Sequence, residues 1–324
     1  MYDRFGRDIR YLRVSVTDRC NLRCRYCMPT EGVEWMPHSA ILSYEQIVRI
    51  VEAAAALGVR KVRLTGGEPL TRKGLPALVG AIKAVPGIRT VSLTTNGLLL
   101  AEQLPDLLSA GLDGVNLSLD TLDRAQFAAL TQRDELSRAL EGLEAALAAP
   151  GLTVKVNCVP TGSNDDQLVP LAGLAKDRAL SVRFIELMPI GLGSTLDRRT
   201  EDEVLSRLEA AFGPASPRPT DPLSGPSRNM TFDGFRGEVG FISAVSHQFC
   251  NSCNRVRLTA TGFLKTCLQY DHGVDLRSML EAGADDAALR AAIAGAIDHK
   301  PAKHHFCGQR EAADERRNMN QIGG

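Results

Sequence analysis

Short stretches in which apolar and polar positions alternate recur along the first 187 residues, and longer stretches with helical spacing separate them. The strand-like stretches are rich in β-branched residues and lie at 12–17, 61–65, 90–95, 114–119, 153–159 and 181–187. Alternation of this kind is typical of β-strands that have one face against a core. The pattern therefore predicts six strands.

Each predicted strand is followed by a predicted helix. Ser43 can cap a helix that Gly58 ends. Further helices are expected at about 74–84, 101–110, 123–130, 136–149 and 166–178, and Thr200 with Glu203 forms the capping box of another. Six strand–helix units in succession predict an α/β fold with a parallel sheet. The simplest form is a partial (β/α)6 barrel similar to a TIM barrel but open on one side, and a doubly wound sheet is the alternative.

The pattern changes after the sixth unit. The stretch 213–228 contains five prolines and predicts a linker or a long surface loop. We therefore divide the chain into a barrel with its linker, residues 1–228, and a C-terminal extension, residues 229–324. Polar residues also gather at the carboxyl ends of the predicted strands, where parallel α/β folds place their active sites.

Composition narrows the classes of function. Lys plus Arg and Asp plus Glu each number 38, so a uniformly basic surface for nucleic acid is not expected. The sequence contains no run of 18 apolar residues, so no membrane span is expected, and the N-terminus lacks the apolar core of a signal peptide. The eight cysteines are clustered, which predicts metal binding or catalysis in a reducing cytoplasm.

The first cysteine cluster has the spacing C-x3-C-x2-C and consists of Cys20, Cys24 and Cys27. Three thiolates can hold three irons of a cubane iron–sulfur cluster. The fourth iron then lacks a protein ligand, and this is the iron at which chemistry can occur. A structural zinc site is the alternative, but it needs four ligands, and the nearest histidine, His38, lies beyond a proline.

The second cysteine cluster consists of Cys250, Cys253 and Cys267, and His247 would complete a zinc site with three cysteines. Arg255 and Arg257 favour a different interpretation. They alternate on a strand-like stretch, so both guanidiniums face one side, where they can bind a phosphate or a carboxylate. A second cubane with an unliganded iron beside this anion clamp would bind a charged substrate. Cations on the predicted strands, namely Arg13, Arg63, Lys155 and Arg183, suggest that some face a polyanion such as a triphosphate.

Motifs along nearly the whole chain resemble those of known enzymes. The first trio resembles the signature of the radical S-adenosylmethionine (radical SAM) enzymes, and GGEP at 66–69 resembles their second motif. The complete set resembles the GTP 3′,8-cyclase family, which begins molybdenum cofactor (molybdopterin) biosynthesis. It comprises VTDRCNLRCRYC, RLTGGEPL, TTNG, NLSLD, VKVNCV, FIELMPIG, FCNSCNRVRL and the terminal Gly323 and Gly324.

The resemblance implies two 4Fe–4S clusters, one bound by each cysteine trio, with SAM on the first and GTP on the second. The positions that match SAM-contacting residues are Tyr26, Gly67, Ser118 and Met188. The positions that match GTP-contacting residues are Arg13, Arg63, Thr94, Lys155, Arg255, Val256 and Arg257. Gly323 and Gly324 match a double glycine that enters the active site. Cys158 and Cys307 match no functional position, and we expect them to be buried filler.

The implied reaction is a radical cyclisation by a lyase. A 5′-deoxyadenosyl radical from SAM removes the C3′ hydrogen of GTP, and C3′ then bonds to C8 to give (8S)-3′,8-cyclo-7,8-dihydroguanosine 5′-triphosphate. No catalytic group is expected beyond the clusters and bound SAM. The implied partners are a one-electron donor and the downstream cyclic pyranopterin monophosphate synthase. The enzyme would be cytoplasmic, bind neither membrane nor nucleic acid, and have the option of forming a homodimer.

Two other functions remain open at this point. One is a different radical SAM enzyme with two clusters, for example one that modifies peptides. The other is a non-catalytic zinc or iron–sulfur binding module. Metal content and a response to GTP distinguish these functions from the cyclase.

Overall fold

The structure is a computed structural model that describes residues 1–219, 225–306, 308 and 311–323. All six predicted strands are present, each within two residues of its predicted bounds. They are β1 (Tyr11–Ser15), β2 (Lys61–Thr65), β3 (Thr90–Thr95), β4 (Gly114–Ser118), β5 (Thr153–Cys158) and β6 (Ser181–Ile185). Neighbouring strands in this series pair in parallel, as the strand–helix alternation predicts.

The C-terminal part of the chain extends this sheet at both edges. Strand β9 (Glu238–Ile242) pairs in parallel with β6, and β10 (Arg255–Leu258) pairs in parallel with β1. Within the described residues the parallel array therefore has eight strands rather than the six that we predicted. The periodicity of the sequence could not show this, because each pairing joins segments that are far apart along the chain.

Shorter antiparallel strands complete the two ends of the sheet. Strands β11 (Phe263–Lys265) and β12 (Gly273–Asp275) follow β10, while β8 (Arg228–Thr231) and β7 (Ser216–Arg218) follow β9. Strand β7 lies inside the stretch that we expected to be a linker, so the described part of 213–228 is partly sheet. The domain boundary after residue 228 stays a prediction, although strands from both sides of it share one sheet.

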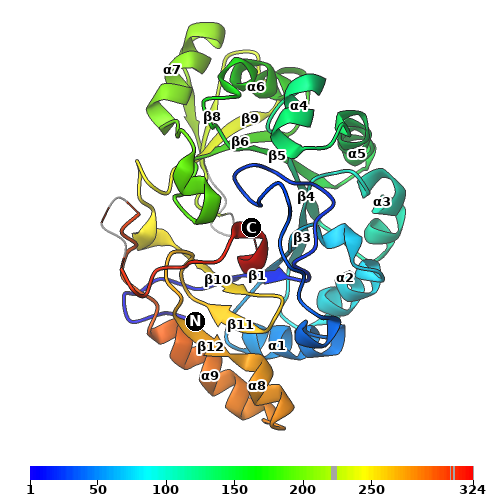
Figure 1. Ribbon diagram of the computed structural model, residues 1–324, viewed down its shortest axis with the longest axis vertical. Coiled ribbons are helices and arrows are strands. Elements are labelled where there is room, and N and C mark those ends of the chain that lie inside the picture. The colour runs from blue at the N-terminus through cyan, green and yellow to red at the C-terminus, as the bar shows by residue number, and fades with distance from the viewer. Residues whose placement is uncertain (220–224, 307, 309–310, 324) are drawn as a thin grey trace.

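Helices cover the outer side of the curved sheet, and the last described helix, drawn in red, lies near the middle of the ring (Figure 1). The helices of the barrel are α1 (Tyr44–Ala56), α2 (Leu75–Ala84), α3 (Leu100–Ser109), α4 (Arg124–Thr131), α5 (Leu136–Ala148), α6 (Leu168–Asp177) and α7 (Glu201–Phe212). The C-terminal region adds α8 (Leu276–Glu281), α9 (Asp286–Asp298) and α10 (Met319–Ile322). The predicted capping box of Thr200 and Glu203 is present at the start of α7.

The two faces of each strand have different tasks. On β2, Val62 and Leu64 are completely buried in the apolar core that the helices cover. Arg63 and Thr65 alternate with them and therefore face the interior of the barrel. The same alternation places Tyr11 and Arg13 of β1 toward the interior. The barrel thus has an apolar outer layer and a polar, positively charged lumen.

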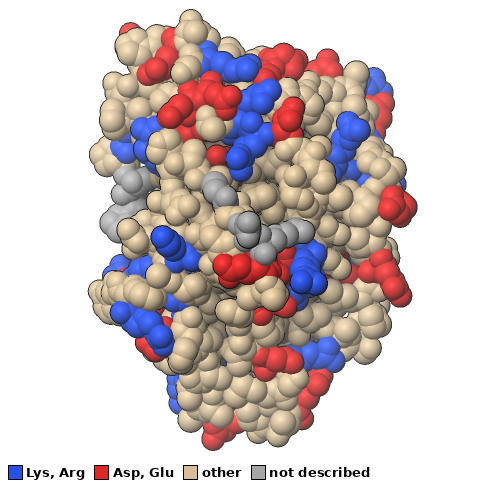
Figure 2. All heavy atoms as spheres, turned by 60° about the vertical axis from the view of Figure 1, so that its left-hand side comes forward, with Lys and Arg blue, Asp and Glu red and all other residues tan. Residues whose placement is uncertain are grey.

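The surface carries charges of both signs. On the face that Figure 2 shows, Lys and Arg side chains are interspersed with Asp and Glu, without an extended area of one sign. Within the described residues, no helix is long and apolar enough to cross a membrane.

Two helical glycines test how closely the helices pack on the barrel. A Cβ added at Gly142 in α5 would lie 2.3 Å from the carbonyl oxygen of Gly97, whereas one added at Gly295 in α9 would meet nothing within 4 Å. We expect Gly142→Ala to lower the free energy of unfolding by about 1–3 kcal/mol through overpacking. Gly295→Ala should raise it by up to about 1 kcal/mol through helix propensity. Urea unfolding followed by circular dichroism measures both, and equal effects at the two positions would contradict this packing.

Candidate active site

The first cysteine trio lies in the loop that follows β1, at the carboxyl end of the barrel strands. Two backbone hydrogen bonds hold this loop to the end of α4, from Arg23 to Thr131 at 2.9 Å and from Arg25 to Leu130 at 3.1 Å. Within the loop, the Cys27 N–H donates to the carbonyl of Cys24 at 2.9 Å. The fold thereby fixes the path of a segment that contains no helix or strand.

The segment after β2, which contains Gly66 and Gly67, contacts the backbone of this loop. The Gly67 N–H donates to the Thr17 carbonyl at 2.8 Å, and the Glu68 N–H donates to the Arg19 carbonyl at 2.7 Å. A Cβ on Gly67 would lie 2.3 Å from the Arg19 carbonyl oxygen. A side chain at this position would therefore push the cysteine loop away from β2, which explains the glycine without any ligand.

Glu68 joins the ends of two neighbouring strands. Its buried carboxylate accepts hydrogen bonds from Thr95 Oγ1 at 2.8 Å and from the Asn96 N–H at 2.7 Å. Burial raises the pKa of Glu68 to about 7, although these hydrogen bonds act in the opposite direction. Its contacts give Glu68 a clear structural role at the rim of the barrel.

Burial disfavours ionisation of the three thiols of the first trio. Burial raises the pKa of Cys20 to about 11 and that of Cys27 to about 12, and it raises the pKa of Cys24 well above its ordinary value. The neighbouring cysteines raise the pKa of Cys24 and Cys27 further. Without metal the thiols stay protonated at neutral pH, and metal binding must release their protons.

The ligand arrangement also bears on the zinc alternative. Among the residues that the structure describes, no three His, Cys, Asp or Glu side chains could hold a metal ion. A zinc ion needs all its thiolates about 2.3 Å from one point. The clusters at the two trios stay predictions from the cysteine spacing.

Tyr26, a predicted SAM-contacting residue, is held by a second side chain. Its hydroxyl donates a hydrogen bond of 2.8 Å to Asp120, whose other carboxylate oxygen accepts from the Val159 N–H at 2.8 Å. Burial raises the pKa of Asp120 to about 6. Asp120 thereby links the cysteine loop to the ends of β4 and β5, a role that the sequence did not indicate.

The second cysteine trio lies at the opposite end of the barrel. Cys253 precedes β10, and β10 runs parallel to β1, so this trio lies at the amino ends of the strands. The polar residues expected at the carboxyl rim came from the six predicted strand–helix units, and this trio lies outside those units. The sequence could not show where the trio lies, because the position of Cys253 depends on the pairing of β10 with β1.

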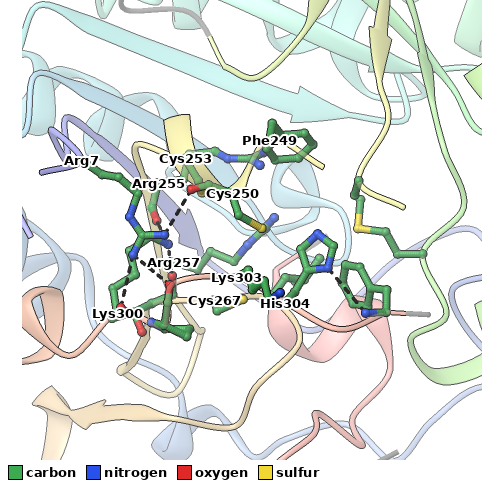
Figure 3. Close-up of a pocket in the computed structure, with 16 residues that line it drawn as sticks. Arg7, Phe249, Cys250, Cys253, Arg255, Arg257, Cys267, Lys300, Lys303 and His304 are labelled. Carbon is green, nitrogen blue, oxygen red and sulfur yellow. Dashed lines mark hydrogen bonds between the residues drawn. The ribbon is translucent and has the colours of Figure 1, made fainter. Parts of the chain in front are cut away.

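Cys250, Cys253 and Cys267 line one cavity (Figure 3). Its other walls combine uncharged residues, among them His304, with the cationic side chains of Arg7, Arg255, Arg257, Lys300 and Lys303. Met188 also lines this cavity, although its sequence position predicts contact with SAM. Burial raises the pKa of Cys253, but the charges of Lys300 and Arg255 outweigh it and lower the pKa to about 6. The surrounding positive charge therefore favours the thiolate form of Cys253.

A row of arginines crosses the lumen beside this cavity. Arg257 of β10, Arg13 of β1 and Arg63 of β2 occupy the same register position on three neighbouring strands. Burial lowers the pKa of all three, to about 10 for Arg13, and their mutual repulsion lowers it further for Arg13 and Arg257. The carbonyl oxygen of Gly323 accepts from Arg13 and Arg257 at 3.4 Å each. Gly324 lies outside the described residues.

Further cations face the same lumen from the other strands. Burial lowers the pKa of Lys155 to about 8 and that of Arg183 to about 9, and repulsion between them and Arg63 adds to this effect. Asn157 accepts from Arg183 at 2.6 Å, and the Asn116 amide oxygen, when turned toward them, accepts from Arg63 and Arg183. The predicted polyanion site is thus a real concentration of buried positive charge.

Two predicted substrate contacts differ from this group. Val256 lies between Arg255 and Arg257, and its side chain belongs to the apolar core, so only its backbone faces the site. The Thr94 hydroxyl oxygen is buried and has no hydrogen-bond partner among the described residues. It is therefore available to a bound group. No finding tests these roles, and they stay predictions.

The structure also places histidines and thiols that the sequence could not assign. His247, the histidine nearest to the second trio in sequence, lies half exposed beside Glu201 and Asp202. His304 lines the cysteine cavity instead. Cys158 is buried, as we expected for an apolar filler. Cys307 lies outside the described residues.

Known proteins share this organisation. Family models match the chain in two parts, the radical SAM superfamily over residues 14–175 and molybdenum cofactor synthesis C over residues 180–306. The chain is 44% identical over 327 residues to GTP 3′,8-cyclase of Moorella thermoacetica and 46% identical over 328 residues to GTP 3′,8-cyclase of Pelotomaculum thermopropionicum. Each of these alignments covers 100% of both chains.

A solved structure supports the fold. Streptococcus suis SuiB bound to S-adenosylmethionine matches 90% of this chain and 68% of its own, with a TM-score of 0.59 and 16% sequence identity. The chain is therefore a member of the radical SAM superfamily, which implies SAM and a 4Fe–4S cluster. Within that superfamily it belongs to the GTP 3′,8-cyclase family, and the resemblance found in the sequence is confirmed.

The pKa of Tyr11 reports on the positive charge of the lumen. Burial raises its pKa, but the charges of Arg63 and Arg13 outweigh burial and lower the pKa from 10.0 to about 8. Titration of ring-labelled tyrosine by ¹³C NMR should show one ring that ionises with a midpoint near pH 8, and Tyr11→Phe should remove that transition. If every tyrosine ionised at pH 10 or above, the lumen would not carry the charge described here.

Proposed function

We propose that this chain catalyses the SAM-dependent radical cyclisation of GTP to (8S)-3′,8-cyclo-7,8-dihydroguanosine 5′-triphosphate, the first step of molybdenum cofactor biosynthesis. The first trio holds the cluster that binds SAM. The second trio, Cys250, Cys253 and Cys267, holds a further 4Fe–4S cluster that binds GTP. Full-length identity to GTP 3′,8-cyclases supports the reaction, and the chemistry of the donor sets supports the clusters.

One observation carries the proposal: the row of buried arginines connects the cavity of the second trio to the lumen. Arg257 lines that cavity and also pairs in register with Arg13, which pairs with Arg63. Guanidiniums bind phosphates bidentately. A nucleotide can therefore place its base at the second trio while its phosphates contact the arginine row.

When bound, the first cluster and SAM supply the 5′-deoxyadenosyl radical that removes a hydrogen atom from the substrate. The residues of the chain determine which hydrogen atom it meets. Tyr26, held by Asp120, and the ends of β2 and β4 at Gly67 and Ser118 position SAM at the carboxyl end of the lumen. Met188 lines the cavity of the second trio. We propose that it contacts SAM from that side, in the lumen between the two cysteine trios.

The substrate is held from the other end. Arg13, Arg63, Lys155 and the Arg255-Val256-Arg257 segment bind the nucleotide, and Thr94 provides a buried hydroxyl. Holding both the phosphates and the base fixes the ribose between the two ends of the barrel. Fixing reactants in this way can lower the activation free energy by up to about 7–11 kcal/mol. The enclosed lumen also keeps other hydrogen donors away from a radical.

The remaining partners follow from the reaction. A one-electron donor must reduce the first cluster, and a cyclic pyranopterin monophosphate synthase would consume the product. We place the enzyme in the cytoplasm, where thiols stay reduced. A homodimer is compatible with these roles.

Product formation under anaerobic conditions tests the proposal. With SAM, a strong reductant and reconstituted clusters, added GTP should cause formation of 5′-deoxyadenosine together with the cyclised nucleotide. Formation of 5′-deoxyadenosine that does not respond to GTP would instead indicate another radical SAM enzyme. A colourless protein with stoichiometric zinc would indicate a binding module without this activity.

Substitutions of Arg257, from the arginine row, and of its neighbour Arg255 test the substrate site. Arg257→Ala should weaken GTP binding by about 2–5 kcal/mol, because it removes a buried charged hydrogen bond to phosphate, and Arg255→Ala should weaken it less, because Arg255 is only partly buried. Both variants should still assemble their clusters. Arg178→Ala removes only an exposed ion pair with Glu144 and should bind GTP like the wild type. Anaerobic calorimetry measures the affinity, and unchanged binding in both arginine variants would remove them from the substrate site.

A further inference from the structure

Two buried cations from opposite ends of the sequence meet beside the second cysteine trio. Arg7 belongs to the N-terminal turn, and Lys300 follows α9 near the other end of the chain. Their exposed fractions are only 5% and 3%. Figure 3 shows both side chains at one edge of the cavity that the three cysteines line.

Arg7 holds backbone carbonyls with four of the N–H donors of its guanidinium. Nη1 donates to the carbonyls of Cys250 and Ala302 at 3.1 Å each, and Nη2 donates to those of Lys300 at 3.2 Å and Pro301 at 2.8 Å. Nε donates to Asp3 at 2.6 Å. A guanidinium has five N–H donors, so these five bonds account for all of them. Arg7 thereby joins the first cysteine of the trio to the segment 300–302.

Asp3 fixes the orientation of the Arg7 side chain. Its second carboxylate oxygen accepts from the N–H groups of Phe5 at 3.0 Å and Arg7 at 2.9 Å, which closes the N-terminal turn. The side chains of Arg7 and Asp3 are 3% and 0% exposed. The turn therefore presents the guanidinium in one orientation.

Lys300 holds the segments that carry the other two cysteines. Its ammonium donates to the carbonyl of Arg255 at 3.1 Å and to that of Thr266. Arg255 follows Cys253 by two residues, and Thr266 directly precedes Cys267. Since Arg7 also binds the carbonyl of Lys300, the two cations together fasten all three cysteine segments.

The charges of the two cations are balanced differently. Asp3 neutralises Arg7, but no described carboxylate lies within ion-pair distance of Lys300. An isolated buried ammonium is costly unless a negative charge compensates it. The groups nearest to it that can carry negative charge are the sulfurs of the trio, because Lys300 lines the same cavity as the three cysteines.

We propose that Arg7 and Lys300 are positioning residues for the second cluster: Arg7 fixes the backbone of its ligand segments, and Lys300 also supplies the counter-charge for its thiolates. This inference rests on the proposed second cluster. Neither residue contacts the reacting atoms in this account. Their effect is on how firmly the three thiolates hold iron and on how easily the cluster is reduced.

The test separates the two clusters. Arg7→Gln and Lys300→Met are introduced into full-length chains in which either the first trio or the second trio is replaced by alanine. After anaerobic reconstitution, iron content and its rate of loss to a chelator are measured. In chains that keep only the second trio, we expect iron to be lost at least tenfold faster than in the parent. In chains that keep only the first trio, iron retention should be unchanged.

Lys300→Met has an additional signature. Removing a positive charge beside the cluster disfavours its more negative, reduced form, so the midpoint potential of the second cluster should fall. Arg4→Ala is the control from the same N-terminal turn, because Arg4 makes an exposed ion pair with Asp298. It should change neither iron retention nor potential.

Four other results of these experiments are also decisive. Unchanged iron retention and potential in both variants with the second trio would overturn the positioning role. Equal loss from both backgrounds would also overturn it, because the substitutions would then act on the whole fold. If Arg7→Gln fails to fold, Lys300→Met decides, since it leaves the N-terminal turn intact. If the parent chain with the second trio holds no cluster at all, the proposed second cluster fails, and this inference fails with it.

Discussion

Positive charge buried inside the barrel is the constraint on which the rest of the structure depends. Arginines and a lysine from neighbouring strands face one lumen, and their burial and mutual repulsion make each cation less favourable there than in water. The chain tolerates this arrangement because amides such as Asn116 and Asn157 and the carbonyl of Gly323 receive hydrogen bonds from the guanidiniums. A polyanionic substrate would relieve the repulsion more completely than these neutral groups can.

The pairing of β10 with β1 places the second cysteine trio beside this buried positive charge. It places the second cysteine trio at the amino ends of the strands, while the first trio follows β1 at their carboxyl ends. The lumen between them is lined by Arg257, Arg13 and Arg63 in one register. In the proposed function, a nucleotide bound along this line would lie between the two cysteine trios, with its ribose inside the barrel. The fold thereby separates the tasks of making a radical and of holding its target.

Much of this could be predicted from the sequence, and the exceptions have physical causes. Alternating apolar positions predicted β1 to β6, and the structure places Arg255 and Arg257 in one cavity with the second trio, while the anion clamp and the metal site stay predictions. Periodicity could not predict that β9 and β10 extend the sheet, because such pairing depends on segments far apart in the chain. Arg7 and Lys300 gave no signal either, since they act on backbone carbonyls and match no motif. The glycines after β2 were associated with a ligand, but they also admit the backbone of the cysteine loop.

The central claim is that the second trio holds a cluster whose unliganded iron binds GTP. The most direct measurement is electron paramagnetic resonance of the reduced cluster in a full-length chain in which Cys20, Cys24 and Cys27 are replaced by alanine, with and without GTP. The account predicts one cluster signal that changes when GTP is added and shows coupling to nitrogen of ¹⁵N-labelled GTP. A signal that stays the same at saturating GTP would contradict it.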